Sequence, residues 1–411
     1  MQTQLAAEYA ATPAGREAEA ILRKCVHCGF CTATCPTYQL LGDELDGPRG
    51  RIYLIKQVLE GVAPTRKTQQ HLDRCLTCRN CETTCPSGVQ YGRLVDIGRE
   101  AVDDKVPRPL GERALRWALK EGLPSPLFGP AVKLGQAVRG LLPGALREKV
   151  PAPRAAGAWP AATHARRMLL LAGCVQPAMA PSINAATARV LDAAGIQAVV
   201  APQAGCCGAV KFHLNDHDGG LAQMRANIDA WWPDVASGAV ESIVVNASGC
   251  GATVKEYGYH LQGDAAYAER AARISALARD PGELLPELAP LLRPRLRAQA
   301  APPPRYAYHP PCTLQHAQKL RGGVEAQLRA LGFDLQVPAE SHLCCGSAGT
   351  YSVLNPALAH ALRDRKLGHL DALAPAAILS ANIGCIAHLQ SGTGVPVRHW
   401  IEVLDEALAP A

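Results

Sequence analysis

The chain has 411 residues, of which 48% are hydrophobic and 19% are charged. This is the composition of a globular protein with buried cores, and it excludes a disordered tail or a fibre. Aromatic residues make up only 5%, which argues against the stacking surfaces that bind single-stranded nucleic acid. The length is suited to two or three domains.

The chain is unusual in having 16 cysteines. The first twenty residues contain no secretory signal pattern. Proline and asparagine interrupt the longest uncharged stretches, 168–188 and 372–397, so neither is expected to be a transmembrane helix. We therefore expect a cytoplasmic protein. In that reducing compartment, cysteines bind metal more often than they pair.

The charge is unevenly distributed along the chain. Residues 1–167 carry an excess of eight basic side chains, whereas residues 168–411 carry an excess of two acidic ones. The basic part is expected to face an anionic surface, either the inner membrane, as a peripheral contact, or an acidic partner. A solvated basic face is the plain alternative. No nucleic-acid motif is present, so we expect no nucleic-acid partner.

A short cysteine pattern occurs twice, 50 residues apart. Both copies have the spacing Cys-x-x-Cys-x-x-Cys-x-x-x-Cys-Pro, which is that of bacterial ferredoxins, where three cysteines hold one [4Fe–4S] cluster and the fourth ligates the other. The sequence thus predicts two [4Fe–4S] clusters with crossed ligation. The first takes Cys25, Cys28, Cys31 and Cys85, and the second takes Cys75, Cys78, Cys81 and Cys35. Zinc is the alternative, because Cys-x-x-Cys pairs also form zinc ribbons.

Helical patterns surround these two loops. Apolar residues in 52–59 follow a helical stripe that Gly61 ends, and residues 91–105 are also expected to be helical. We predict an all-α, ferredoxin-like two-cluster domain over residues 1–105. Frequent prolines then indicate a connector with broken helices over residues 106–167.

A longer repeat fills the rest of the chain. Each copy alternates strand-like and helical segments, which predicts parallel α/β units, and each places its cysteines directly after the strands. The copies are expected at 168–300 and 301–411, giving an α+β multidomain protein with two pseudo-symmetric units. The first contains Cys174, Cys206, Cys207 and Cys250, and the second contains Cys312, Cys344, Cys345 and Cys385.

Both copies separate the first cysteine from the vicinal pair by 32 residues. The carboxyl ends of parallel strands meet at one edge of a sheet, so each set of four thiols is expected to converge there. Each set is a candidate site for a further iron–sulfur cluster or for zinc, and His309, His316 and His388 are candidate imidazole ligands. The alternative is that these cysteines are buried structural residues.

Other cofactor motifs are missing from the sequence. No Gly-x-Gly-x-x-Gly lies at a strand-to-helix turn, and no phosphate loop, zinc-protease helix or nucleophile elbow is present. We assign no catalytic residue, and we expect substrate oxidation to take place on another subunit.

Two ferredoxin motifs followed by two Cys-Cys-Gly repeats resemble the iron–sulfur subunits of flavin-linked hydroxyacid dehydrogenases. More narrowly, the segments 25–51, 71–85, 248–251 and 341–350 resemble the bacterial glycolate oxidase iron–sulfur subunits. The resemblance covers nearly the whole chain and is weakest in the connector. Heterodisulfide reductase subunits have similar repeats with one more cysteine, where this chain has Thr253 and His388. This departure argues against their unusual cluster in this chain.

The resemblance implies a subunit of glycolate dehydrogenase that works with two flavin-type subunits. These would oxidise glycolate to glyoxylate, and the electrons would leave through the clusters of this chain to a quinone or another acceptor. The equivalent subunit of a lactate or glycerol-3-phosphate dehydrogenase is an alternative. A non-redox, zinc-stabilised binding module is another.

Overall fold

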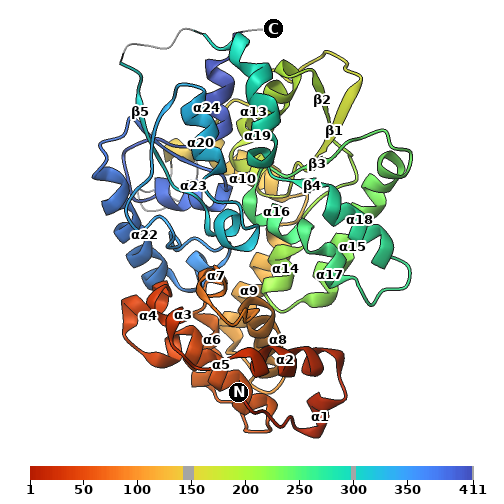
Figure 1. Ribbon diagram of the computed structural model, residues 1–411, viewed down its shortest axis with the longest axis vertical. Coiled ribbons are helices and arrows are strands. Elements are labelled where there is room, and N and C mark those ends of the chain that lie inside the picture. The colour runs from red at the N-terminus through yellow and green to blue at the C-terminus, as the bar shows by residue number, and fades with distance from the viewer. Residues whose placement is uncertain (142–151, 298–301, 410–411) are drawn as a thin grey trace.

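The N-terminal part of the chain is helical. In the computed structural model, which describes residues 1–141, 152–297 and 302–409, it forms the lower part of the molecule in Figure 1. Its elements are α1 (Ala7–Ala10), α2 (Pro13–Lys24), α3 (Phe30–Ala33), α4 (Pro36–Leu41), η1 (Glu44–Asp46), α5 (Pro48–Leu59), α6 (Arg66–Asp73), α7 (Asn80–Thr84) and α8 (Tyr91–Asp103).

Local signals in the sequence account for the main helices of this module. Thr12 caps α2 by accepting a hydrogen bond from the Gly15 amide at 2.9 Å, and a proline opens both α2 and α5. The apolar faces of α2, α5 and α8 meet in one core that includes the fully buried Leu22, Ile55 and Leu94. This core holds the two cysteine loops at its edge.

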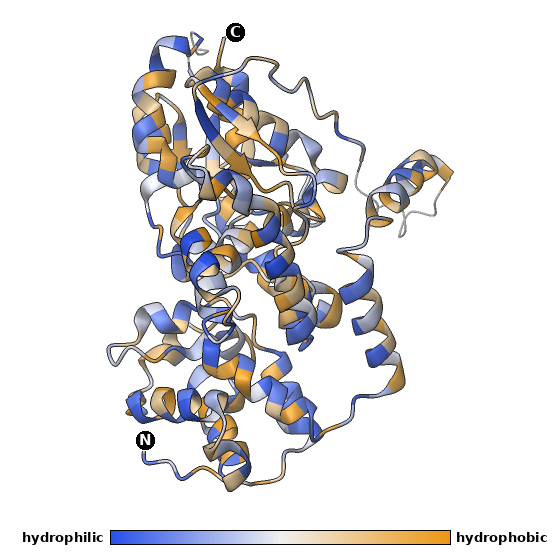
Figure 2. Cartoon of the chain, turned by 90° about the vertical axis from the view of Figure 1, so that its right-hand side faces the viewer, coloured by the Kyte–Doolittle hydropathy of each residue, from blue (hydrophilic) through white to orange (hydrophobic). Residues whose placement is uncertain are grey.

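The connector begins with two helices and a short 3₁₀ turn, α9 (Leu110–Gly122), α10 (Phe128–Ala137) and η2 (Arg139–Leu141). These broken helices agree with the prolines of the segment. In Figure 2 they lie along the right-hand side, at the edge of the molecule. Residues 142–151 of the predicted connector, and the predicted boundary between the repeats at 300–301, lie outside the described residues.

The two long repeats fold into two α/β units of matching topology. The first contains β1 (Arg166–Leu170), α12 (Gln176–Met179), α13 (Pro181–Ala193), β2 (Ile196–Val199), α14 (Ala209–His213), α15 (His217–Ala236), β3 (Ile243–Val244), α16 (Ser248–Lys255), α17 (Tyr257–His260), α18 (Ala268–Leu277), β4 (Ala278–Arg279), α19 (Pro281–Leu292) and η3 (Arg293–Arg295). The second contains β5 (Arg305–Tyr308), the π-helical turn η4 (Thr313–Ala317), α20 (Gly323–Ala330), β6 (Asp334–Gln336), α21 (Tyr351–Leu354), α22 (Pro356–Asp371), β7 (Ala377–Ser380), α23 (Ile383–Gln390), β8 (Val397–His399) and α24 (Trp400–Ala407).

All strand pairs within the two sheets are parallel. The strand orders are β2-β1-β3-β4 and β6-β5-β7-β8, so the second sheet repeats the first strand for strand. The sequence pattern predicts three strands in each unit, at 168–172, 196–200 and 242–246 and at 305–309, 333–337 and 377–380. The structure adds β4 and β8 as edge strands. Both are short, with two and three residues, and lack a long apolar run that would reveal them.

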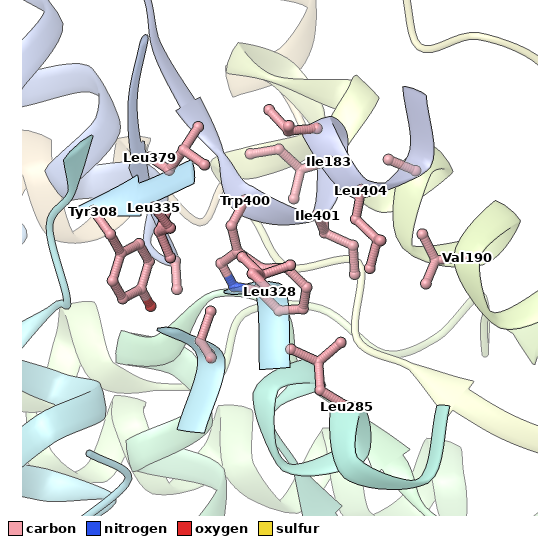
Figure 3. Packing of buried hydrophobic residues seen from close by; sticks show 14 of the residues in the cluster. Ile183, Val190, Leu285, Tyr308, Leu328, Leu335, Leu379, Trp400, Ile401 and Leu404 are labelled. Atoms are coloured by element: carbon pink, nitrogen blue, oxygen red, sulfur yellow. The ribbon is translucent and has the colours of Figure 1, made fainter. Parts of the chain in front are cut away.

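The two α/β units share one hydrophobic core. Helix α13 of the first unit packs against α24 of the second, and α19 packs against α20. Figure 3 shows Ile183 and Leu285 from the first unit facing Leu328, Trp400 and Ile401 from the second, and all five are buried. Burial of each such side chain stabilises the pair by about 1.5–3 kcal/mol, so the units form one body.

Candidate metal centres

The first cysteine loop lines an open cavity at the edge of the N-terminal core. Cys25, Cys28 and Cys31 from this loop and Cys85 from the second loop all border it, and Cys81 borders it from the side of the second loop. Together with the solvent at its mouth, this space comprises about 430 Å³ free of protein atoms. The four thiols expected to share one cluster thus border a common space that side chains do not fill.

The second cysteine loop lines a neighbouring cavity. Its bordering residues include Cys75, Cys78 and Cys81 from the second loop and Cys35 from the first. The exchange of the fourth cysteine between the two loops, which the ferredoxin spacing predicts, is therefore compatible with the backbone path. These donors are all thiols, the ligand type of iron–sulfur clusters.

Both cysteine loops have the same backbone conformation. The third and fifth residues from the first cysteine have positive φ in each copy: His27 at 56° and Gly29 at 84° in the first, Thr77 at 51° and Arg79 at 58° in the second. Left-handed residues at these points turn the chain tightly. The repetition shows that the two loops are built to the same plan, which the matched spacing predicted.

The thiol sites of the N-terminal module are electrostatically unfavourable for thiolates. Burial, followed by the neighbouring Cys25, raises the pKa of Cys31 to about 11, and burial also raises the pKa values of Cys78 and Cys81 well above the usual thiol value. A bound metal group would supply the positive charge that keeps these groups deprotonated.

A buried arginine, which the sequence analysis did not single out as a site residue, lies beside the second cavity. Arg51 is 1% exposed, pairs with the equally buried Asp46 at 3.4 Å and donates to the Thr37 hydroxyl at 3.1 Å. Although burial opposes its charge, nearby Cys75 and other acidic groups raise the pKa of Arg51. This cation offsets the negative charge of thiolates at the site.

In the first α/β unit the four cysteines come together from three loops. Cys174 follows β1, Cys206 and Cys207 follow β2, and Cys250 lies in the first turn of α16 after β3. The Sγ atoms of Cys174 and Cys206 are 3.5 Å apart. Hydrogen bonds with Cys206 and Cys250 raise the pKa of Cys207, so those thiols are close as well. The convergence at the carboxyl ends of the strands is as predicted.

The second α/β unit assembles its thiols in the same way, with one addition. The Sγ atoms of Cys312 and Cys344 are 3.7 Å apart. The Sγ atoms of Cys345 and Cys385 and one ring nitrogen of His309 lie within 4.8 Å of one another. All four cysteines of this unit are buried.

The glycine after each vicinal cysteine pair is required by the fold. Gly208 has φ +95° and Gly346 has φ +91°, a conformation that glycine adopts without strain. A Cβ at Gly346 would lie 2.4 Å from the Ala359 carbonyl oxygen in α22, and a Cβ at Gly208 would lie 2.8 Å from the Gly220 oxygen in α15. The glycine therefore lets a helix pass directly over the cysteine pair.

The second unit lies next to the second ferredoxin cavity. Leu76, Cys312 and Cys344 belong to one buried cluster, and Cys78 packs against it. The Asn80 side chain links Thr34 and His342 by donating to their carbonyl oxygens at 3.0 and 3.3 Å. Two sets of thiols, separated by more than 200 residues in the chain, are thus neighbours.

Two of the three candidate histidines have other partners. His316 Nε2 donates to the His342 carbonyl oxygen at 2.9 Å, and its Nδ1 accepts from Arg321 at 2.8 Å. His388 Nε2 donates to the Ala359 carbonyl oxygen at 3.1 Å. Only His309 joins the thiols in a ligand-like group among the residues that the structure describes.

The fold and its cysteines define a class of iron–sulfur protein. Residues 21–89 match the family model of the 4Fe-4S dicluster domain, and residues 168–255 and 306–390 match that of the cysteine-rich domain. The chain is 57% identical over 410 residues to the glycolate oxidase iron-sulfur subunit of Escherichia coli (strain K12), with 99% of each chain covered. It belongs to the family of glycolate oxidase iron–sulfur subunits, which are electron-transfer proteins of an oxidoreductase.

Two further relatives are less similar in sequence. The chain is 29% identical to the probable glycolate oxidase iron-sulfur subunit of Bacillus subtilis (strain 168), over 91% of this chain and 89% of the relative. It is 27% identical to lactate utilization protein A of Geobacillus thermodenitrificans (strain NG80-2), and the alignment covers 58% of this chain and 98% of the relative. Among the described residues, no helix has both the length and the apolar character needed to cross a membrane.

Proposed function

We propose that this chain is the electron-transfer subunit of a flavin-dependent complex that oxidises glycolate to glyoxylate. Two flavin-type partner subunits remove the electrons from the substrate, and this chain conducts them to a quinone or another acceptor. One observation carries the proposal: the second ferredoxin cavity, through Cys78, lies against Cys312 and Cys344 of the second α/β unit. Adjacent thiol sites are what stepwise electron transfer through one chain requires.

Two [4Fe–4S] clusters occupy the N-terminal module in this proposal. One is held by Cys25, Cys28, Cys31 and Cys85, and the other by Cys35, Cys75, Cys78 and Cys81. The two cavities bordered by these sets support the assignment. The module chelates and orients the clusters, excludes water from the buried cysteines and compensates charge through Arg51. The clusters themselves supply one-electron redox chemistry.

The eight cysteines of the α/β units hold a further metal group in at least one unit. In support, the thiols of each unit converge on one edge of its sheet. Buried thiols that are crowded together either stay protonated or bind a cation. Because the second unit contacts the N-terminal module near Cys78, an iron–sulfur cluster there extends the electron path.

Substrate oxidation takes place outside this chain. The proposal rests on the sequence, which carries no nucleotide-binding pattern, and on the fact that iron–sulfur clusters do not accept hydride. The pure chain is therefore expected to reduce no artificial acceptor with glycolate, and the complex with its flavin-type partners is expected to do so. Turnover by the single chain would contradict the division of labour.

Glycolate is favoured over other hydroxyacids by the full-length match. The lactate-related relatives align with little more than half of this chain, whereas the glycolate-related ones cover nearly all of it. The decisive experiment is to purify the complex with its flavin-type partners and compare oxidation of glycolate, lactate and glycerol 3-phosphate. Preference for one of the latter two would overturn the substrate assignment. A colourless, zinc-containing chain would instead indicate a binding module.

A peripheral contact with the inner membrane, on its cytoplasmic side, completes the proposal. The connector helices expose large apolar side chains, with Leu110 at 79%, Trp117 at 63% and Leu134 at 68% exposure. Arg113 and Lys133 are exposed on the same helices. Apolar side chains next to basic ones are the features by which interfacial helices bind anionic lipid.

Vesicle flotation tests the membrane contact. The wild-type chain is expected to float with anionic vesicles at low salt and less so at high salt. The double change Trp117→Ser and Leu134→Ser should weaken flotation. Leu291→Ser, which makes the same apolar-to-polar change at an exposed leucine on α19, should not. Equal flotation of all three would show that this surface is not the contact.

A further inference from the structure

His309 is a buried histidine at the second thiol site. It follows β5 directly and its exposed fraction is 0%. Neither Nδ1 nor Nε2 has a hydrogen-bond partner among the residues that the structure describes. Buried polar groups are nearly always paired, so an imidazole in this state calls for a ligand.

The backbone holds this imidazole in place. The His309 amide donates to the Leu379 carbonyl oxygen at 2.8 Å, and the His309 carbonyl oxygen accepts from the Ser380 hydroxyl at 2.9 Å. Both bonds tie His309 to β7, at the edge of the sheet where the cysteines gather. The ring nitrogen lies within 4.8 Å of the sulfur atoms of Cys345 and Cys385 as a result of this fixed position.

The first unit has no such group at the equivalent position. His309 precedes Cys312 by three residues, and Leu171 precedes Cys174 by three. Leu171 is 2% exposed and packs within the apolar core of its unit. Since the two units share topology and thiol placement, the histidine distinguishes the second site chemically from the first.

We propose that one ring nitrogen of His309 ligates the metal group of the second unit, together with its cysteines, and that this group is an iron–sulfur cluster. The inference rests on the proposed electron-transfer function, because the adjacency to Cys78 is what favours iron over zinc. Imidazole and thiolate together are an established donor set for iron–sulfur centres. At its thiol site the first unit has Cys174, Cys206, Cys207 and Cys250, with Leu171 at the position equivalent to His309.

Nitrogen ligation has a redox consequence. A neutral imidazole donates less negative charge to iron than a thiolate, and clusters with histidine ligands have higher reduction potentials than their all-cysteine counterparts. The cluster of the second unit is therefore expected to accept electrons from the adjacent N-terminal cluster. Ligation by His309 would thus raise the potential of this centre relative to an all-cysteine site.

The test uses the full-length chain, purified anaerobically and reduced until its clusters are paramagnetic. Pulsed electron paramagnetic resonance should detect a strongly coupled nitrogen, and growth with ¹⁵N-histidine should change that coupling. His309→Leu, which copies the first unit, and His309→Cys should both lose it. The matched control His388→Gln, a buried histidine three residues after Cys385 whose bond to Ala359 glutamine can replace, should keep it.

A second measurement separates ligation from a packing role. His309→Cys is expected to retain the iron of the second unit while the reduction potential of one centre falls. His388→Gln is expected to leave all potentials unchanged. A nitrogen coupling that survives in both His309 variants, or that is missing in the wild-type chain although the second unit holds iron, would overturn the proposal. The ¹⁵N-histidine measurement needs no variant, so it decides the question even if a variant fails to fold.

The metal content distinguishes failure of this inference from failure of the proposed function. The N-terminal module accounts for about eight irons. Cys345→Ser should remove the iron of the second unit and leave those eight. A chain with eight irons and zinc in the second unit, or nothing there, would refute histidine ligation of a cluster and leave the electron-transfer function standing. A chain without the eight irons would refute the proposed function itself.

Discussion

The two α/β units have the same topology but meet the N-terminal module in different ways. The first unit is joined to it mainly through charged groups, among them Arg79 to Glu256 at 2.9 Å and His217 to Glu100 at 3.3 Å. The second unit is joined through uncharged hydrogen bonds, such as Tyr351 to the Arg74 carbonyl oxygen at 3.1 Å, and through the buried cluster around Cys312.

This difference is consistent with two roles for the duplicated unit, electron transfer by one copy and structural support by the other. The ion pairs of the first contact join partly exposed side chains, and such pairs add little stability each. The second contact excludes water and brings thiols of both parts together. We infer that the second copy is the one on the electron path, and that the first supports its position.

The thiol sites of the two units also differ in their surroundings. In the first unit Cys174 and Cys250 are partly exposed, and hydrogen bonds from Cys174 and Cys207 lower the pKa of Cys206 to about 3. In the second unit every cysteine is buried, and Lys366 lies nearby with its pKa lowered to about 8 by burial. Among the described residues, a buried cation and a buried imidazole thus accompany the second of the two duplicated sites.

The largest expected effect comes from removing a thiol on the proposed path. Cys345→Ser should slow acceptor reduction by the assembled complex by roughly 10- to 100-fold, as changes around metal sites do. Cys207→Ser, the equivalent change in the first unit, should preserve most of the rate. The measurement is glycolate-dependent reduction of a quinone analogue. Equal losses in both variants would contradict the functional difference between the units.

The next effect concerns the N-terminal cluster that faces the second unit. Cys35→Ser should remove that cluster and lower the iron of the module from about eight to about four. Because ligation is crossed, Cys78→Ser added to Cys35→Ser should cost no further iron, whereas Cys28→Ser added to it should remove nearly all. Iron analysis of these full-length variants distinguishes the pairings. The reverse pattern would show that each loop binds its own cluster with four cysteines.

Substituting the glycine after each vicinal cysteine pair compares the free energy of unfolding that the two units lose. Gly346→Ala combines left-handed strain of about 1–2 kcal/mol with overpacking of about 1–3 kcal/mol, because the new Cβ would meet the Ala359 oxygen at 2.4 Å. Gly208→Ala should cost less, since its Cβ would lie 2.8 Å from the Gly220 oxygen. Urea unfolding of both variants tests the order. A larger loss for Gly208→Ala would refute this geometric reading.

The smallest effect is a pH dependence of the contact between the first α/β unit and the N-terminal module. Although burial lowers the pKa of His217, its hydrogen bond with Glu100 raises it above 6.5, and the same bond lowers the pKa of Glu100 below 4.5. The histidine therefore stabilises the contact at low pH and stops doing so as pH rises through its raised pKa. The glutamate stabilises it above pH 4.5 and stops as pH falls through its lowered pKa.

The contact should accordingly be tightest between about pH 4.5 and 6.5, with a gain below about 1 kcal/mol because both groups are partly exposed. Thermal unfolding of the wild-type chain and of His217→Gln across this range measures it. The difference between the two should shrink above neutral pH. A constant difference at all pH values would show that the pair contributes no linked proton.

The sequence by itself determined the local geometry of the thiol sites. Cysteines three residues apart force tight turns, and both loops adopt them at the same positions, with His27 and Thr77 left-handed alike. The matched spacing of the long repeats likewise determined two parallel sheets with thiols at their carboxyl edges. These features depend on short-range sterics and on strand direction, which a sequence pattern encodes directly.

Only the tertiary structure decided which sites are neighbours and which histidine is free. The contact of Cys78 with Cys312, the shared core around Trp400, and the partners of His316 and His388 join residues far apart in the chain or on different elements. No local pattern distinguished His309 from these two histidines. That it has no partner among the described residues follows from where β5 and β7 end relative to their polar groups, and that depends on how the chain packs.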